Sequence, residues 1–147
     1  VIVREKGGRV GGVPPDSLLC DVAKKMVKDN IGAIVIREDE HEPMGIWTER
    51  DLMRQTYEPD FDPKTAKIRD YMTKELKKVD ASASIYKMLE MFLGLRLRHV
   101  FVTENDKTIG LLSIGDVIRA ALHEKDRELK ELNEMVSWEY YENWRWT

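Results

Sequence analysis

One seven-residue pattern occurs twice in the chain and constrains how the chain can fold. Residues 45–51 read GIWTERD, and residues 110–116 read GLLSIGD, 65 positions later. Each copy holds a glycine, two apolar residues, a hydroxyl residue, two further positions and an aspartate, and an arginine follows three residues after the aspartate. A pattern repeated at a fixed distance indicates a duplicated structural unit. We therefore expect two copies of one small fold.

The segments around each copy predict the elements of that fold. Apolar residues at helical spacing predict a first helix, and a short run rich in β-branched residues predicts a buried strand after it. A charged turn, a return strand and a second helix follow. The predicted class is α+β, with a short β-sheet and two helices in each repeat. The strand runs are 31–36 and 44–47 in the first repeat and 97–102 and 109–112 in the second.

The predicted boundaries follow from the repeat and from one change in composition. Repeat 1 is assigned to residues 1–57 and repeat 2 to residues 66–124. Residues 58–65, which hold two prolines and three acidic residues, are the predicted linker. Residues 125–147 are predicted to extend the last helix and end in an aromatic tail.

The C-terminal extension carries two features that repeat 1 lacks. Leu122, Leu129 and Val136 lie seven residues apart, which indicates a narrow apolar seam on a helix. Residues 138–146 hold five aromatic residues among nine, a density that favours a partner surface.

Composition excludes several classes of function. A net charge of −3 without clustered Lys and Arg argues against a nucleic-acid or anionic-membrane partner. No apolar run approaches the roughly 20 residues that span a bilayer. The single cysteine, Cys20, excludes an internal disulfide framework and favours a reducing compartment, so we expect a cytoplasmic protein.

The hydroxyl and acidic residues of the pattern have two interpretations. Thr48 with Asp51, and Ser113 with Asp116, have the spacing of a helix capping box, which needs no ligand. The same geometry also suits a ribose, because a carboxylate at that place can accept hydrogen bonds from two neighbouring hydroxyls. Local spacing does not separate the two interpretations, and both can hold together.

Catalysis and metal binding find no support in the sequence. The pairs His41-Glu42 and His123-Glu124 lack further ligands at metal spacing. No nucleophile, base and orienting group form a set for covalent catalysis. We expect neither an enzyme nor a metal site.

The two strand-to-helix turns and the strands NIGAIVI and LRLRHVFV resemble those of a CBS domain. The two repeats together resemble a Bateman module, which is a pair of CBS domains, over about residues 7–122. The resemblance implies two units packed as a pseudo-two-fold pair. It also implies clefts that bind AMP, ADP, ATP, S-adenosylmethionine or NAD. The ribose-binding aspartates would be Asp51 and Asp116, with Thr48 and Ser113 as hydroxyl neighbours.

The resemblance also predicts that the two sites differ. Positions that meet phosphates in some members of the family fall on 32–33 in repeat 1 and on Arg98 and His99 in repeat 2. Arg98 and His99 offer one permanent and one titratable positive charge. Repeat 1 has no charge at these positions, so Arg50 is the expected substitute. The alternatives are roles without a ligand. His99 would then be a polar residue at a strand end, and Arg98 would form a surface salt bridge.

The predicted function is therefore an adenine-nucleotide sensor that forms a homodimer. One alternative is a ligand-free assembly module whose repeated turns are only helix caps. Another is a regulatory subunit that binds a protein partner through its aromatic tail.

Overall fold

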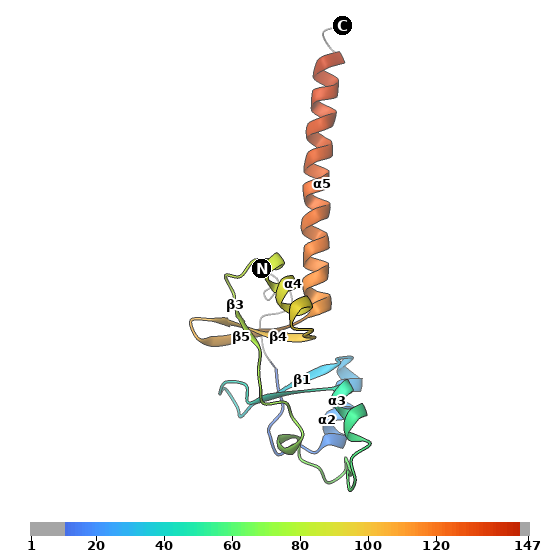
Figure 1. Ribbon diagram of the computed structural model, residues 1–147, viewed down its shortest axis with the longest axis vertical. Coiled ribbons are helices and arrows are strands. Elements are labelled where there is room, and N and C mark those ends of the chain that lie inside the picture. The colour runs from blue at the N-terminus through green and yellow to red at the C-terminus, as the bar shows by residue number, and fades with distance from the viewer. Residues whose placement is uncertain (1–10, 145–147) are drawn as a thin grey trace.

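The computed structural model describes residues 11–144, with side chains to residue 136, and it confirms the α+β class (Figure 1). Repeat 1 contains α2 (Leu19–Asp29), β1 (Ala33–Ile36), β2 (Gly45–Thr48) and α3 (Glu49–Gln55). A short 3-10 helix, η1 (Ile68–Asp70), follows it. Repeat 2 contains β3 (Lys78–Asp80), α4 (Ile85–Gly94), β4 (His99–Glu104), β5 (Lys107–Ser113) and α5 (Ile114–Trp144).

The two repeats share one strand register. Strands β1 and β2 are antiparallel, and Ala33 pairs with Thr48. In repeat 2, β4 is antiparallel to β5, and His99 pairs with Ser113. The short strand β3 pairs with β4 in parallel. In repeat 1, an isolated parallel β-bridge between Val13 and Ile36 occupies the equivalent position. The duplicated sequence therefore folds into duplicated sheets.

The first helix of each repeat ends in the same unusual backbone conformation. Asn30 has φ 53° and Arg96 has φ 52°, both in the left-handed region, and they lie 66 residues apart. Asn tolerates this region, whereas a long side chain such as Arg adopts it at an energetic cost. The turn at this residue directs the chain from the helix into the strand, so both repeats use the same device.

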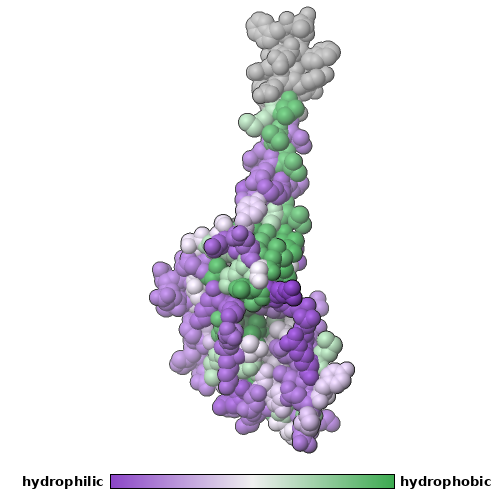
Figure 2. Space-filling view, viewed as in Figure 1, coloured by the Kyte–Doolittle hydropathy of each residue, from purple (hydrophilic) through white to green (hydrophobic). Residues whose placement is uncertain are grey.

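Helix α5 continues far beyond repeat 2 as one unbroken helix (Figure 1). Apolar side chains lie along it and remain exposed, and Figure 2 shows them as a green band that reaches the base of the helix. Leu129, for example, is 58% exposed. The predicted extension of the last helix is therefore present. The side chains of the aromatic tail lie outside the described residues. In the described part of the chain, no helix combines the length and apolar character needed to cross a membrane.

Both faces of each small sheet are covered. In repeat 1, Ile34 and Ile36 belong to the core beneath the helices, while Val35 points to the opposite face and is only 4% exposed. In repeat 2, Phe101 occupies the corresponding place and is 2% exposed. In Figure 1 the two sheets lie between the helices of repeat 1 and those of repeat 2. The faces that carry Val35 and Phe101 therefore cover each other.

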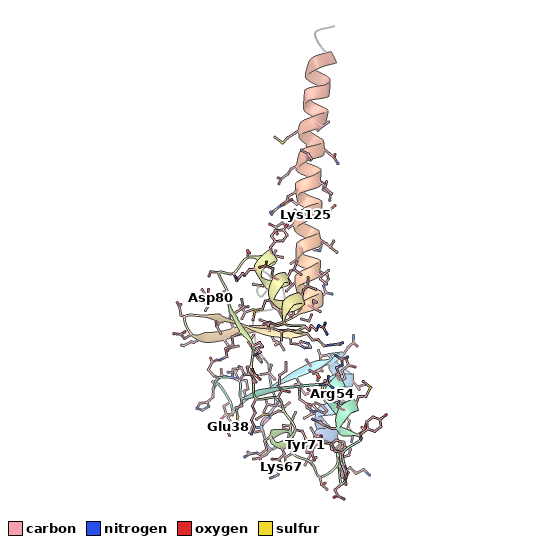
Figure 3. All side chains as sticks on the ribbon, viewed as in Figure 1. Glu38, Arg54, Lys67, Tyr71, Asp80 and Lys125 are labelled. Carbon is pink, nitrogen blue, oxygen red and sulfur yellow. The ribbon has the colours of Figure 1, made fainter. Side chains whose placement is uncertain are left out.

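A carboxylate joins the hairpin turns of the two repeats. Thr108 donates to Glu42 from its backbone N–H (3.1 Å, to Oε1) and from its hydroxyl (2.6 Å, to Oε2). In Figure 3 the two hairpin ends lie on the same side of the molecule, near the labels of Glu38 and Asp80. The Thr108 hydroxyl, and then its backbone N–H with the charges of Lys78 and Arg37, hold the pKa of Glu42 below its ordinary value against the opposing effect of desolvation.

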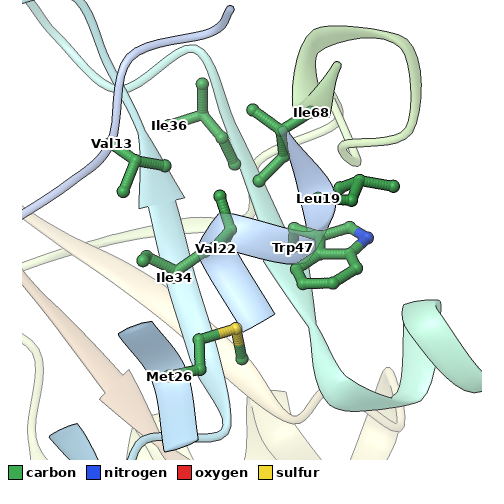
Figure 4. Close-up of a cluster of buried hydrophobic side chains, with 8 residues drawn as sticks. All are labelled: Val13, Leu19, Val22, Met26, Ile34, Ile36, Trp47 and Ile68. Atoms are coloured by element: carbon green, nitrogen blue, oxygen red, sulfur yellow. The ribbon is translucent and has the colours of Figure 1, made fainter. Parts of the chain in front are cut away.

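The core of repeat 1 includes a residue from outside the predicted repeat. Ile68, on η1, is fully buried and packs with the apolar side chains of α2, β1 and β2 (Figure 4). The cluster consists of Val13, Leu19, Val22, Met26, Ile34, Ile36, Trp47 and Ile68.

Backbone hydrogen bonds hold the segment 61–73, which spans the predicted boundary between linker and repeat 2, against repeat 1. Ile68 N–H donates to the Ser17 carbonyl (2.9 Å), and Ile46 and Thr73 exchange hydrogen bonds of 2.8 and 3.0 Å. The Gln55 amide donates to the Tyr71 carbonyl (3.0 Å) and accepts from the buried Trp47 indole (2.9 Å). This segment is thus part of the structure of repeat 1.

Replacing Ile68 by Ala is expected to lower the free energy of unfolding by about 2–4 kcal/mol, because it opens a cavity in a packed core. Urea denaturation measures the change. Lys67→Ala, an exposed neighbour in the same segment, is the control and should change stability by less than about 0.5 kcal/mol. Equal effects of the two variants would contradict the role of Ile68 in this core.

Replacing Glu42 by Ala is expected to lower stability by about 0.5–1 kcal/mol at pH 7, because Thr108 loses an exposed charged acceptor. The pKa of Glu42 is lowered by folding, so its contribution is present above the pKa of the unfolded carboxyl and is lost as the pH falls from about 5 to about 3. Urea denaturation at several pH values measures this difference. Glu40→Ala is the control, and a difference independent of pH would contradict the expectation.

Candidate functional site

The first turn of interest joins β2 to α3 and forms a complete capping box. The Asp51 N–H donates to Thr48 Oγ1 (3.2 Å), and Asp51 Oδ2 accepts from the Thr48 N–H (2.9 Å) and hydroxyl (3.0 Å). None of these three hydrogen bonds involves Asp51 Oδ1, which accepts no hydrogen bond from the described residues. The capping interpretation is therefore correct for this turn, and one carboxylate oxygen remains available.

The second turn joins β5 to α5 and repeats this geometry with one addition. The Asp116 N–H donates to Ser113 Oγ (3.2 Å), and Asp116 Oδ2 accepts from the Ser113 N–H (2.8 Å). Arg119, one turn along α5, donates to Asp116 Oδ1 (2.7 Å). The corresponding Arg54 forms no ion pair with the residues that the structure describes. The second carboxylate is therefore neutralised within its own helix.

Strand register brings the other predicted residues of repeat 2 to this turn. His99 pairs with Ser113 across β4 and β5, and the Arg98 carbonyl accepts from Ile114 N–H (3.0 Å). Four predicted residues from two segments thus meet at one end of the sheet: Arg98, His99, Ser113 and Asp116.

The equivalent place in repeat 1 has the opposite charge. Ala33 pairs with Thr48, and the Gly32 carbonyl accepts from Glu49 N–H (3.1 Å). A Cβ atom added to Gly32 would lie 2.5 Å from Glu49 Oε1, so the Glu49 carboxylate lies against this glycine. Gly32 and Glu49 also border a pocket of about 430 Å³ with mostly apolar walls from α2 and α3. Arg50 is exposed on the first turn of α3.

The arrangement in repeat 2 suits an anionic, hydroxyl-bearing ligand. The N-terminus of α5 carries a partial positive charge from its aligned peptide dipoles. Arg98, whose side chain is exposed, adds a full positive charge and His99 a titratable one. A carboxylate and a hydroxyl stand beside them. Repeat 1 offers the carboxylate and hydroxyl without the basic pair.

Two contributors to the sites were not identified from the sequence. Glu49 was not expected to lie against Gly32, because nothing in the local pattern connects the first turn of a helix with the start of another strand. Arg119 follows Asp116 in the repeated pattern, as Arg54 follows Asp51, but that similarity does not reveal which arginine forms an ion pair.

Among the described residues, no group of three or more His, Cys, Asp or Glu side chains lies close enough together to hold a metal ion.

The chain belongs to the CBS-domain family. The family model for the CBS domain matches residues 12–58 and again residues 68–123, so the chain holds two copies of this domain. The protein is thus a tandem pair of CBS domains with a C-terminal helical extension.

Known CBS-domain proteins resemble this chain. The mitochondrial CBS domain-containing protein CBSX3 of Arabidopsis thaliana is 31% identical over 147 residues, covering 95% of this chain and 71% of CBSX3. The crystal structure of the CBS-domain containing protein ATU1752 from Agrobacterium tumefaciens is 31% identical, with a TM-score of 0.74, covering 82% of this chain and 90% of that one.

A second similar structure contains a ligand. CBSX2, solved in complex with AMP, has a TM-score of 0.71 and covers 84% of this chain and 97% of its own. Its sequence identity of 23% supports a shared fold.

Proposed function

We propose that the protein is a regulatory module without catalytic activity of its own, which binds an adenosine-containing ligand at its strand-to-helix turns. The observation that carries the proposal is the turn of repeat 2, where a carboxylate, a hydroxyl, a helix N-terminus and a basic pair meet. AMP in the CBSX2 complex supports the choice of ligand class.

The aspartates would hold the ribose. Asp51 Oδ1 accepts no hydrogen bond from the described residues and can receive a ribose hydroxyl without disturbing the capping box. At Asp116 the ribose would displace Arg119. That displacement costs little, because the Arg119 side chain is 68% exposed and exposed ion pairs are weak. The capping and ligand-binding roles of each aspartate are therefore compatible.

The phosphate would distinguish the two sites. Arg98 and His99 favour a phosphorylated adenosine at Asp116, as in AMP, ADP or ATP. Glu49 beside Gly32 disfavours an anion at the corresponding place in repeat 1, where Arg50 is the nearest basic candidate in the turn. S-adenosylmethionine, which carries no phosphate, is an alternative ligand for the first site. NAD, whose pyrophosphate is anionic, is an alternative ligand for the second.

Regulation would act through the packing of the two repeats. A ligand shifts a conformational equilibrium only if it binds one arrangement more tightly than the other. The faces around Val35 and Phe101 and the hydrogen bonds from Thr108 to Glu42 are the contacts between repeats that such a ligand would alter.

Calorimetric titration with AMP, ATP, S-adenosylmethionine, NAD and adenosine tests the proposal. We expect Asp116→Ala to weaken AMP binding by at least about tenfold, because a partly buried acceptor for a hydroxyl is lost. Arg98→Gln should weaken AMP binding and leave adenosine binding nearly unchanged.

The matched control is Ser84→Ala, which removes the N-cap of α4 and should cost about 1 kcal/mol of stability without changing binding. If Asp116→Ala behaves like Ser84→Ala and none of the five ligands binds the folded wild-type protein, the ligand-free assembly module replaces the sensor.

We also propose that the protein is a homodimer joined through α5. Ile118, Leu122, Leu129, Leu132 and Val136 are exposed and alternate in steps of three and four along the helix, with Lys125 at the remaining position. This is the spacing of a coiled-coil seam, and the same seam on a second copy is complementary to it. The cost of leaving five large apolar side chains in water favours such pairing.

Replacing Leu129 by Asp is expected to raise the dimer dissociation constant at least about tenfold, because a charge enters the middle of the seam. Sedimentation equilibrium measures this. Arg127→Asp, on another face of α5, is the control and should leave the dimer intact. A dimer that survives both Leu129→Asp and truncation after Glu124 would show that the seam does not join the subunits.

The alternative partner is another protein bound by the aromatic tail, and co-purification with and without residues 138–147 distinguishes it from self-association. We propose the cytoplasm as the compartment, on the ground of the single free cysteine.

A further inference from the structure

The arginine that follows each aspartate of the repeated pattern has different surroundings in the two repeats. Arg119 donates to Asp116 Oδ1 over 2.7 Å. Arg54, at the same place after Asp51, forms no ion pair with the residues that the structure describes. Both arginines stand three residues after an aspartate that caps its helix, so spacing does not explain the difference. The cause lies in the residues around each pair.

The residue before the aspartate supplies the room for this ion pair. It is Gly115 in repeat 2 and Arg50 in repeat 1. A Cβ atom added to Gly115 would lie 3.6 Å from Arg119 Nη1 and 3.6 Å from Ser113 Oγ. The Arg119 guanidinium therefore folds back over the first turn of α5, toward the hydroxyl that caps it. In repeat 1 the same place carries the positive charge of Arg50, which disfavours a second guanidinium there.

The position of the Arg119 guanidinium is favourable only while it has an anionic partner. The N-terminus of a helix carries a partial positive charge, which disfavours a cation. Asp116 offsets this effect, and the Ser113 N–H holds its carboxylate at the start of the helix (2.8 Å). The Arg119 side chain is 68% exposed, whereas that of Asp116 is only 11% exposed. Arg119 is therefore the member of the pair that can move.

A bound nucleotide would change the partner of Arg119. In the proposed function a ribose hydroxyl takes Asp116 Oδ1, the oxygen to which Arg119 donates in the free protein. The released guanidinium then lies beside a positive helix end without its carboxylate partner. Adenosine offers it no anion, because adenosine is uncharged. The phosphate of AMP restores an anionic partner, and a guanidinium can bind phosphate through two parallel hydrogen bonds.

We propose that Arg119 makes the turn of repeat 2 selective for phosphorylated ligands, because it pairs with Asp116 in the free protein and with the ligand phosphate in the complex. This inference rests on the proposed function of the turn. It gives Arg119 a different task from that of Arg98. Loss of Arg98 should affect only the ligand that carries a phosphate, whereas loss of Arg119 should affect AMP and adenosine in opposite directions.

Calorimetric titration of the full chain with AMP and adenosine tests this assignment, in an Asp51→Ala background that removes the ribose acceptor of repeat 1. Arg119→Gln is expected to strengthen adenosine binding by about two- to fivefold, because the ribose no longer competes with an exposed ion pair. The same variant is expected to weaken AMP binding by at least about fivefold, because the charge-assisted hydrogen bonds to the phosphate are lost.

Two further variants serve as controls. Arg54→Gln removes the same charge from the equivalent place in repeat 1 and should leave both affinities within about twofold of those of the background protein. Arg119→Lys keeps the charge without the paired hydrogen bonds, so it should retain part of the preference for AMP.

The outcomes separate this inference from the proposed function. Affinities for AMP and adenosine that stay unchanged in Arg119→Gln, or that fall together, would overturn the inference and leave the proposed function standing. The same changes in Arg54→Gln as in Arg119→Gln would also overturn it, because they would reflect net charge alone. Absence of AMP binding to the wild-type chain would remove the proposed function, and this inference with it.

Discussion

The structure depends on the burial of two small sheets on both faces. A sheet of two or three short strands is not stable alone in water. Here each sheet is covered by the helices of its own repeat on one face and by the other repeat on the opposite face, where Val35 and Phe101 are buried. The pairing of the repeats is therefore a condition of folding, and every site between or beside the sheets inherits its position from that pairing.

The candidate sites follow from the register of the two hairpins. Pairing of His99 with Ser113, and of Ala33 with Thr48, sets the start of one strand beside the end of the next. The helix that begins there is capped by the aspartate, so the carboxylate is held in place before any ligand arrives. Because the backbone register is the same in both repeats, the two turns differ through their side chains: in the charges beside them and in the ion pair that Arg119 forms with Asp116.

Much of the fold was predictable because the same pattern occurs twice in the sequence, so the elements expected around one copy can be compared with those around the other. Helical spacing, β-branched runs and the repeated turn predicted the elements, and the capping-box spacing predicted the hydrogen bonds of Asp51 and Asp116. The packing of residues 61–73 on repeat 1 was not predictable. Prolines and acidic residues make this stretch resemble a linker, and Ile68 is an isolated apolar residue whose burial depends on a core formed by segments distant in sequence.

Interactions between residues a few positions apart specify the local elements, the repetition and the residues that cap the second helix of each repeat, so these features can be predicted from the sequence. Tertiary packing sets three further contacts among the described residues: Arg119 pairs with Asp116 whereas Arg54 forms no ion pair, Glu49 lies against Gly32, and Ile68 closes the core of repeat 1. These contacts depend on side-chain direction and on the relative placement of whole elements, which result from packing both faces of the sheets at once.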